Sequence, residues 1–149
     1  MKWCTFIGHK DCPVEIFDKL YYEIEKLILK ENVRIFYVGT NGNFDKMIYQ
    51  VLEKLESKYN ITIYVVLAYL NMKKKNIYFN INKTIFPNTL EKTPLRYAIN
   101  KRNEYMIKKS DYIICFVKNT FSNSYNYLQV AMKNNLEIIN LGSYKSNES

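Results

Sequence analysis

Small polar residues follow a glycine at two places where an apolar stretch of this chain ends. The residues at these two turns are Gly8, His9 and Lys10 at the first, and Gly39, Thr40, Asn41, Gly42, Asn43 and Asp45 at the second. A glycine lets the backbone approach a ligand closely, and the helix that begins after each turn offers unpaired N–H groups. This chemistry predicts a small anionic ligand, in particular one related to a nucleotide. A tight turn without a ligand is the alternative interpretation of each glycine.

Two side chains at these turns could take part in acid–base chemistry. His9 is the only histidine of the chain, which excludes a metal site built on a pair of histidines. Its imidazole could donate to a phosphate or shuttle a proton, and a solvated loop histidine is the alternative. Asp45 falls in the first turn of an expected helix, where a carboxylate stabilises the helix by about 0.3–1 kcal/mol without any ligand. Its functional alternative is a hydrogen bond to ribose hydroxyls.

Apolar strands alternate with amphipathic helices from one end of the chain to the other. We expect strands at 3–7, 34–38, 62–69, 111–117 and 137–141, and helices at about 13–30, 44–59, 95–109 and 124–134. This alternation predicts an α/β fold of the Rossmann-like kind: a doubly wound, five-stranded parallel sheet in the order 3-2-1-4-5 with helices on both faces. Ligands in such sheets bind beyond the carboxyl ends of the strands at the topological switch, here between strands one and four.

The connection at 71–93 is longer than the others and has no helical period. We expect a short hairpin at about 77–85, and a connection of this length is often a lid. Lys73 to Lys75 would be either a solvated turn or positive charge over an anionic ligand. Tyr69, at the end of the third expected strand, is a candidate for stacking on a base.

Length and composition predict one domain over 1–142 followed by a polar tail at 143–149. The net charge is +8, but nineteen of the twenty-two cations are lysines scattered along the chain, so the charge favours anionic partners only weakly. The longest apolar run, Ile63 to Leu70, is too short for a membrane span, and the first residues do not form a signal peptide. We therefore expect a cytoplasmic protein without a membrane partner, and leave homo-oligomerisation open.

The three cysteines match no metal motif, and Cys4 and Cys115 lie in expected core strands. Buried free thiols are the expected state of these residues. We expect neither a metal nor a cofactor.

Four segments spread over the chain carry a family likeness. They are Cys4-Thr5-Phe6-Ile7-Gly8-His9-Lys10, then Phe36-Tyr37-Val38-Gly39 with Gly42-Asn43-Phe44-Asp45, then Thr84-Ile85-Phe86-Pro87, and finally Ala98-Ile99 and Arg102-Asn103 before Ser110-Asp111-Tyr112-Ile113-Ile114. In type and order they resemble the SLOG superfamily, the Rossmann-like nucleotide-binding domains related to Smf/DprA and LOG proteins. The likeness is to short, stand-alone bacterial members of unassigned function.

The resemblance adds further residues to the expected site. It places Arg102 and Asn103 next to the switch point, where the arginine could grip a phosphate with two N–H groups; a surface salt bridge is the alternative. Relatives carry a glycine pair after the fourth strand, but this chain has Phe121 followed by Ser122, Asn123 and Ser124. Side chains therefore replace bare backbone at that corner, and the serine hydroxyls could donate hydrogen bonds to a ligand.

Three functions remain open at this point. The first is binding of a nucleotide or nucleotide derivative, as a sensor or a sequestering domain. The second is hydrolysis of a nucleotide at its N-glycosidic bond; relatives with this activity carry an acid after the fourth strand. This chain has no acidic residue between Asp111 and Glu137, so Asp45 would have to serve, with His9 as proton shuttle. The third is single-stranded nucleic-acid binding as in the DprA branch, which needs a basic track interleaved with aromatic side chains.

Overall fold

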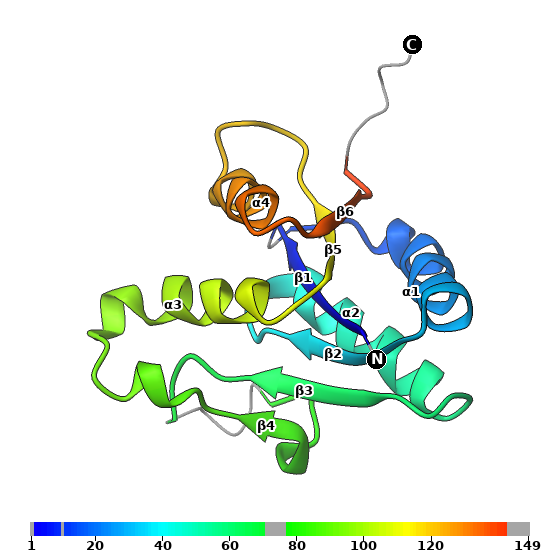
Figure 1. Cartoon of the computed structure of the whole chain (residues 1–149), viewed down its shortest axis with the longest axis horizontal. Helices are drawn as coiled ribbons and strands as arrows, with labels where there is room; N and C mark the ends of the chain where they lie inside the picture. Colours follow the sequence, from blue (N-terminus) through cyan, green and yellow to red (C-terminus); the bar gives the residue numbers. More distant parts are fainter. Residues whose placement is uncertain (1, 10, 71–76, 143–149) are drawn as a thin grey trace.

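A parallel sheet forms the centre of the protein. The computed structural model describes residues 2–9, 11–70 and 77–142. Six strands lie in the order β4-β3-β2-β1-β5-β6, and every neighbouring pair is parallel (Figure 1). The strands are β1 (Lys2–Gly8), β2 (Val33–Val38), β3 (Thr62–Val66), β4 (Thr84–Ile85), β5 (Tyr112–Phe116) and β6 (Glu137–Asn140).

The predicted strand count of five and the predicted order are wrong because of β4. Instead of a hairpin, this two-residue strand pairs in parallel with the end of β3, Thr84 opposite Val65 and Ile85 opposite Val66. The N–H of Leu67 extends the ladder by donating to the carbonyl of Ile85 at 2.9 Å. A strand of two residues is too short to show a period of its own. The other five strands lie in the order β3-β2-β1-β5-β6, so the chain switches sides of β1 between β3 and β5.

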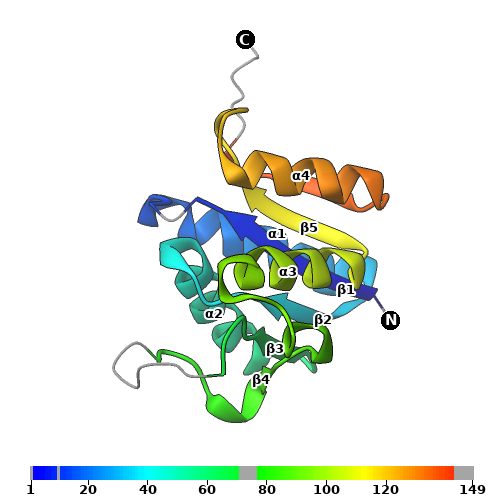
Figure 2. The same ribbon diagram turned by 90° about the vertical axis from the view of Figure 1, so that its left-hand side faces the viewer.

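Two helices cover each face of the sheet. The longer helices are α1 (Phe17–Glu31), α2 (Gly42–Glu56), α3 (Leu95–Lys108) and α4 (Asn123–Lys133), and the single-turn helices are η1 (Val14–Ile16), η3 (Ile81–Lys83) and η4 (Asn88–Leu90). α1 packs with α2 on one face, and α3 packs with α4 on the other, which is the face seen in Figure 2. The helices therefore form two layers around a buried sheet, as parallel strands require.

Local sequence signals explain where the helices begin and end. In α1, the residues Leu20, Ile24 and Leu27 recur at helical spacing and are buried. Asn32 ends the helix in the left-handed conformation with φ 59°, and its N–H donates to the carbonyl of Leu27. Asn135 adopts the same conformation after α4 with φ 62°, which confirms the expected stop at this position.

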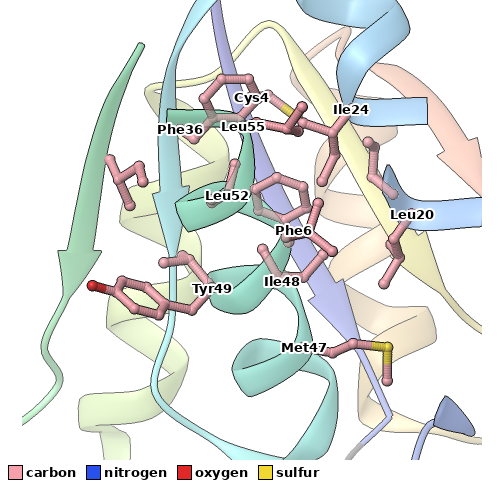
Figure 3. Packing of buried hydrophobic residues seen from close by; sticks show 14 of the residues in the cluster. Cys4, Phe6, Leu20, Ile24, Phe36, Met47, Ile48, Tyr49, Leu52 and Leu55 are labelled. Atoms are coloured by element: carbon pink, nitrogen blue, oxygen red, sulfur yellow. The ribbon is translucent and has the colours of Figure 1, made fainter. Parts of the chain in front are cut away.

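Apolar side chains fill both spaces between the helices and the sheet. Figure 3 shows the first cluster, in which Phe6 and Phe36 of the sheet meet Leu20 and Ile24 of α1 and Leu52 of α2. The second cluster joins α3 and α4 to the opposite face. The cysteines, Cys4, Cys12 and Cys115, are buried free thiols, as expected, and burial raises the pKa of each.

Some expectations concern parts of the chain that are not described. The polar tail at 143–149, the lysines at 73–75 and Lys10 all lie outside the described residues. Within the described part, no helix has the length and hydropathy needed to cross a membrane.

Candidate functional site

A hollow of about 270 Å³, lined by both polar and apolar side chains, lies at the carboxyl end of β1, beside the switch point. Residues from four parts of the fold line it: the end of β1 and the turn after it, the start of α2, the middle of α3 and the start of α4. The lining residues are Phe6, Ile7, Gly8, His9, Asn41, Asp45, Ile99, Arg102, Asn103, Ser122, Asn123, Ser124 and Tyr127. This is the edge at which an open parallel sheet binds ligands.

Arg102 connects several of the segments that surround the hollow. Its side chain is only 1% exposed. Nε donates to the amide oxygen of Asn103 at 2.8 Å, and Nη2 donates to that of Asn41 at 2.7 Å. Nη1 donates to the carbonyl of Val66 at 2.9 Å and to the hydroxyl of Thr40 at 3.3 Å. One buried guanidinium therefore ties α3 to the ends of β2 and β3.

These bonds change the interpretation of Arg102. The alternative of a surface salt bridge is wrong, because the guanidinium is buried. Four of its five N–H groups donate to acceptors among the described residues, and the fifth, on Nη2, has no acceptor there. A two-pronged grip on a phosphate would require some of these bonds to break.

Asp45 lines the hollow as a buried carboxylate. Its Oδ2 accepts the N–H of Asn41 at 2.9 Å, and the side chain lies near Arg102. Burial raises the pKa of Asp45 to about 6, although the charge of Arg102 and the N–H of Asn41 both act in the opposite direction. This carboxyl group therefore changes its protonation close to neutral pH, unlike an ordinary surface aspartate.

The two turn glycines make room for protein side chains. A Cβ at Gly39 would lie 2.8 Å from Oδ2 of Asp45 and 3.1 Å from Cζ of Arg102. A Cβ at Gly8 would lie 2.5 Å from the ring of Phe44. Gly8 also lines the hollow, whereas Gly39 does not. The sequence predicted that the backbone at these glycines approaches a ligand closely. In the structure, it approaches side chains of the protein instead.

The start of α4 supplies the opposite wall of the hollow. Ser122 caps this helix, since its Oγ accepts the N–H of Tyr125 at 3.2 Å. The N–H groups of Asn123 and Ser124, in the first turn, have no acceptor within the helix. His9 closes this side: its Nε2 accepts the N–H of Lys118 at 3.1 Å, so in this arrangement the ring proton is on Nδ1.

Four lining residues were not predicted as site residues: Phe6 and Ile7 at the end of β1, Ile99 of α3 and Tyr127 of α4. Tyr127 lies one helical turn after Asn123 on α4, and its hydroxyl donates to the amide oxygen of Asn100 at 2.8 Å. Ile99 lies three residues before Arg102 on α3. Tyr127 and Ile99 could have been found from the sequence, because residues three or four positions apart lie on the same face of a helix.

Other predicted site residues lie away from the hollow. Thr40 accepts a hydrogen bond from Arg102 but does not line it, and Gly42, with φ 85°, begins α2. Asn43 borders a separate depression between η1 and α2. Tyr69 borders an apolar hollow with Phe86 and other residues near the start of α3. Of the predicted residues with described placements, the structure brings together Gly8, His9, Asn41, Asp45, Arg102, Asn103, Ser122, Asn123 and Ser124.

The fold and the hollow define a parallel α/β domain with a hydrogen-bonding crevice at its switch point, compatible with the Rossmann-like class. No protein-family model matches the chain, and no curated protein matches it either. Among the described residues, no three His, Cys, Asp or Glu side chains are grouped as metal ligands.

Proposed function

We propose that this protein binds a nucleotide or nucleotide-derived ligand in the hollow at the end of β1, as a sensor or a sequestering domain. The observation that carries the proposal is the hollow beside the switch point, where the first turn of α4 lies opposite the start of α2. A helix start such as that of α4 presents unpaired N–H groups and the positive end of the helix dipole to an anion.

The other lining groups suit the remaining parts of such a ligand. Ser124 carries a neutral hydroxyl that can donate and accept hydrogen bonds, as sugar hydroxyls and base edges require. Asn103 and Tyr127 are neutral as well, but Oδ1 of Asn103 already accepts from Arg102 and the hydroxyl of Tyr127 already donates to Asn100. Ile99 adds apolar surface for a planar ring. The volume of about 270 Å³ lies just below the range of roughly 300–1,000 Å³ that is common for ligand pockets. A ligand of mononucleotide size is therefore expected.

A matched pair of variants tests this proposal. Asn123 is exposed and lines the hollow, so Asn123→Trp should obstruct it without altering the core. Asn126 is exposed on the same helix and does not line the hollow, so Asn126→Trp is the control. We expect a thermal-shift screen of nucleotides, followed by calorimetry, to find ligands that bind wild type and the control but bind Asn123→Trp at least tenfold more weakly. No binding by any nucleotide, or equal binding by both variants, would contradict the proposal.

Asp45 favours a second candidate function, hydrolysis of the N-glycosidic bond. A carboxyl group with a pKa of about 6 is suited to general acid–base catalysis near neutral pH, and Asp45 faces the hollow. In this reaction water adds to the anomeric carbon, the C–N bond breaks and the base leaves with a proton.

Chromatography of nucleoside monophosphates incubated with the protein tests this second function. Release of free base and ribose phosphate that falls at least a hundredfold in Asp45→Asn, but not in the exposed Glu53→Gln of the same helix, would support it. Intact nucleotide after prolonged incubation with a protein that binds it would leave binding as the function.

A further inference from the structure

The helices on the two faces of the sheet differ in charge. α1 and α2 carry seven acidic and five basic side chains, whereas α3 and α4 carry one acidic and five basic side chains. Leaving out the buried Asp45 and Arg102 keeps this difference. The excess of basic side chains on the helices therefore lies on the face of α3 and α4, which is turned toward the viewer in Figure 2.

The basic side chains of the two faces also differ in their partners. The lysines near α1 and α2 that form ion pairs with glutamates are Lys26, Lys58 and Lys83. On α3, Lys101 lies 3.9 Å from Glu104, but the exposed Arg96 and Lys108 form no ion pair with a described residue. Positive charge on α3 is therefore left without a protein counterion, which favours an anionic partner.

Aromatic rings lie beside these cations at both ends of α3. Tyr97 is 47% exposed, and Cζ of Arg96 lies 4.8 Å from the centre of its ring. Near the other end of the helix, Nζ of Lys109 lies 5.6 Å from the centre of the half-buried ring of Tyr105. Rings next to cations offer both a surface on which a base can stack and a charge for the phosphate that follows it.

The exposed members of this set share the outer face of α3. Tyr97, Lys101 and Lys108 are four and seven residues apart, so they lie along one side of the helix, whereas Arg102 and Asn103 are buried on the other side. At 1.5 Å per residue, α3 is about 21 Å long. Several nucleotides of an extended strand could therefore lie along it.

We propose that the outer face of α3 binds single-stranded nucleic acid, with Lys101 and Lys108 at its phosphates and Tyr97 stacked on a base. A duplex suits this face less well, because its bases already stack on each other. A polyanion without bases could use the lysines but not the ring. This surface is separate from the hollow, which Arg102 and Asn103 line from the opposite side of the helix, so the proposal does not depend on the proposed function.

Fluorescence anisotropy with a labelled single-stranded oligonucleotide of about 12 nucleotides tests the proposal. The same oligonucleotide as a duplex and inorganic polyphosphate are the comparison probes. We expect the single strand to bind with an affinity that falls steeply as salt rises, and the duplex and polyphosphate to bind at least tenfold more weakly. No binding of the single strand at low salt, or equal binding of either comparison probe, would overturn the proposal.

Two pairs of substitutions separate this face from the net charge of the protein. Lys101→Gln combined with Lys108→Gln should weaken the single strand at least tenfold and reduce the salt dependence of its affinity. Lys19→Gln combined with Lys30→Gln is the control, because these lysines are exposed on α1 and the change in net charge is the same. Equal losses from both pairs would mean that no particular face binds, and would overturn the proposal.

The stacking role of Tyr97 has its own matched control. Tyr22 on α1 is 60% exposed, and Nζ of Lys26 lies 5.3 Å from the centre of its ring. Tyr97→Ala should weaken the single strand fivefold or more, and Tyr22→Ala should leave its affinity unchanged. Melting temperatures measured beforehand verify that each variant is folded. An unchanged affinity in folded Tyr97→Ala would overturn the proposed recognition of a single strand.

Discussion

Two turns border the hollow, and each connects a strand to the helix that follows it. They differ in how their polar groups are paired. In the turn from β2 to α2, Gly39 allows Asp45 and Arg102 to approach within a buried network. In the turn from β5 to α4, residues 118–121 are all exposed, and Phe121 is 96% exposed. The first turn has its polar groups committed to each other before a ligand arrives, whereas the second leaves backbone donors for one. A binding site can use both kinds of turn: the paired turn fixes the shape of the hollow, and the exposed turn can adjust to a ligand.

Removal of Arg102 should have the largest effect on this contrast. Arg102→Met leaves the acceptors Asn41, Asn103 and the carbonyl of Val66 without their donor and Asp45 without its nearby cation. We expect a loss of roughly 3 kcal/mol in the free energy of unfolding, measured in urea. Arg96→Met, at an exposed position next to Tyr97, is the control and should cost less than about 1 kcal/mol. Equal losses would show that the network does not hold the first turn.

Asp45→Asn should reveal the cost of the buried carboxylate through its dependence on pH. The pKa rises from 3.8 to about 6 on folding, so the folded state binds more protons and wild type loses stability as pH rises from about 4 to 6. This shift corresponds to roughly 3 kcal/mol at pH 8. We expect the variant to melt at a higher temperature than wild type at pH 8, by an amount that shrinks at pH 4. A constant difference between the two melting temperatures would contradict the raised pKa.

Substitutions in the turn from β5 to α4 should change stability little, except at Ser122, which caps α4. Ser122→Ala removes the acceptor for the N–H of Tyr125 and should cost about 1 kcal/mol in urea unfolding. Phe121→Ala removes an almost fully exposed ring and should change stability by less than about 0.5 kcal/mol. A large loss from Phe121→Ala would mean that this turn is packed in solution.

Removing the hydroxyl groups of two neighbouring tyrosines, Tyr49 and Tyr78, should have the smallest effects on stability, and the two effects should differ. The hydroxyl of Tyr49 accepts the N–H of Asn80 at 2.8 Å, whereas the buried hydroxyl of Tyr78 has no hydrogen-bond partner in the described part of the chain. Tyr49→Phe should therefore cost about 1 kcal/mol, and Tyr78→Phe should be neutral or slightly stabilising. The midpoints of urea unfolding measure both. A loss from Tyr78→Phe as large as that from Tyr49→Phe would indicate a bound partner at Tyr78, such as a buried water molecule.

Prediction from the sequence worked best where the evidence was local. The alternation of strands and helices and the end of the last helix at about residue 134 were both predicted from the printed residues. Several residues of the hollow followed from one rule, that strand ends at the switch point meet. β4 was missed because its position depends on pairing with β3 and not on its own two residues.

The sequence by itself determined the succession of strands and helices and the apolar faces that must be buried in a covered parallel sheet, because both follow from residue spacing. Only the tertiary structure decided that Arg102 is committed to protein acceptors and that Asp45 is buried beside it. Both outcomes depend on how much water and which partners surround a polar group. Those surroundings are assembled from segments far apart in the sequence, so residue type and local spacing do not contain them.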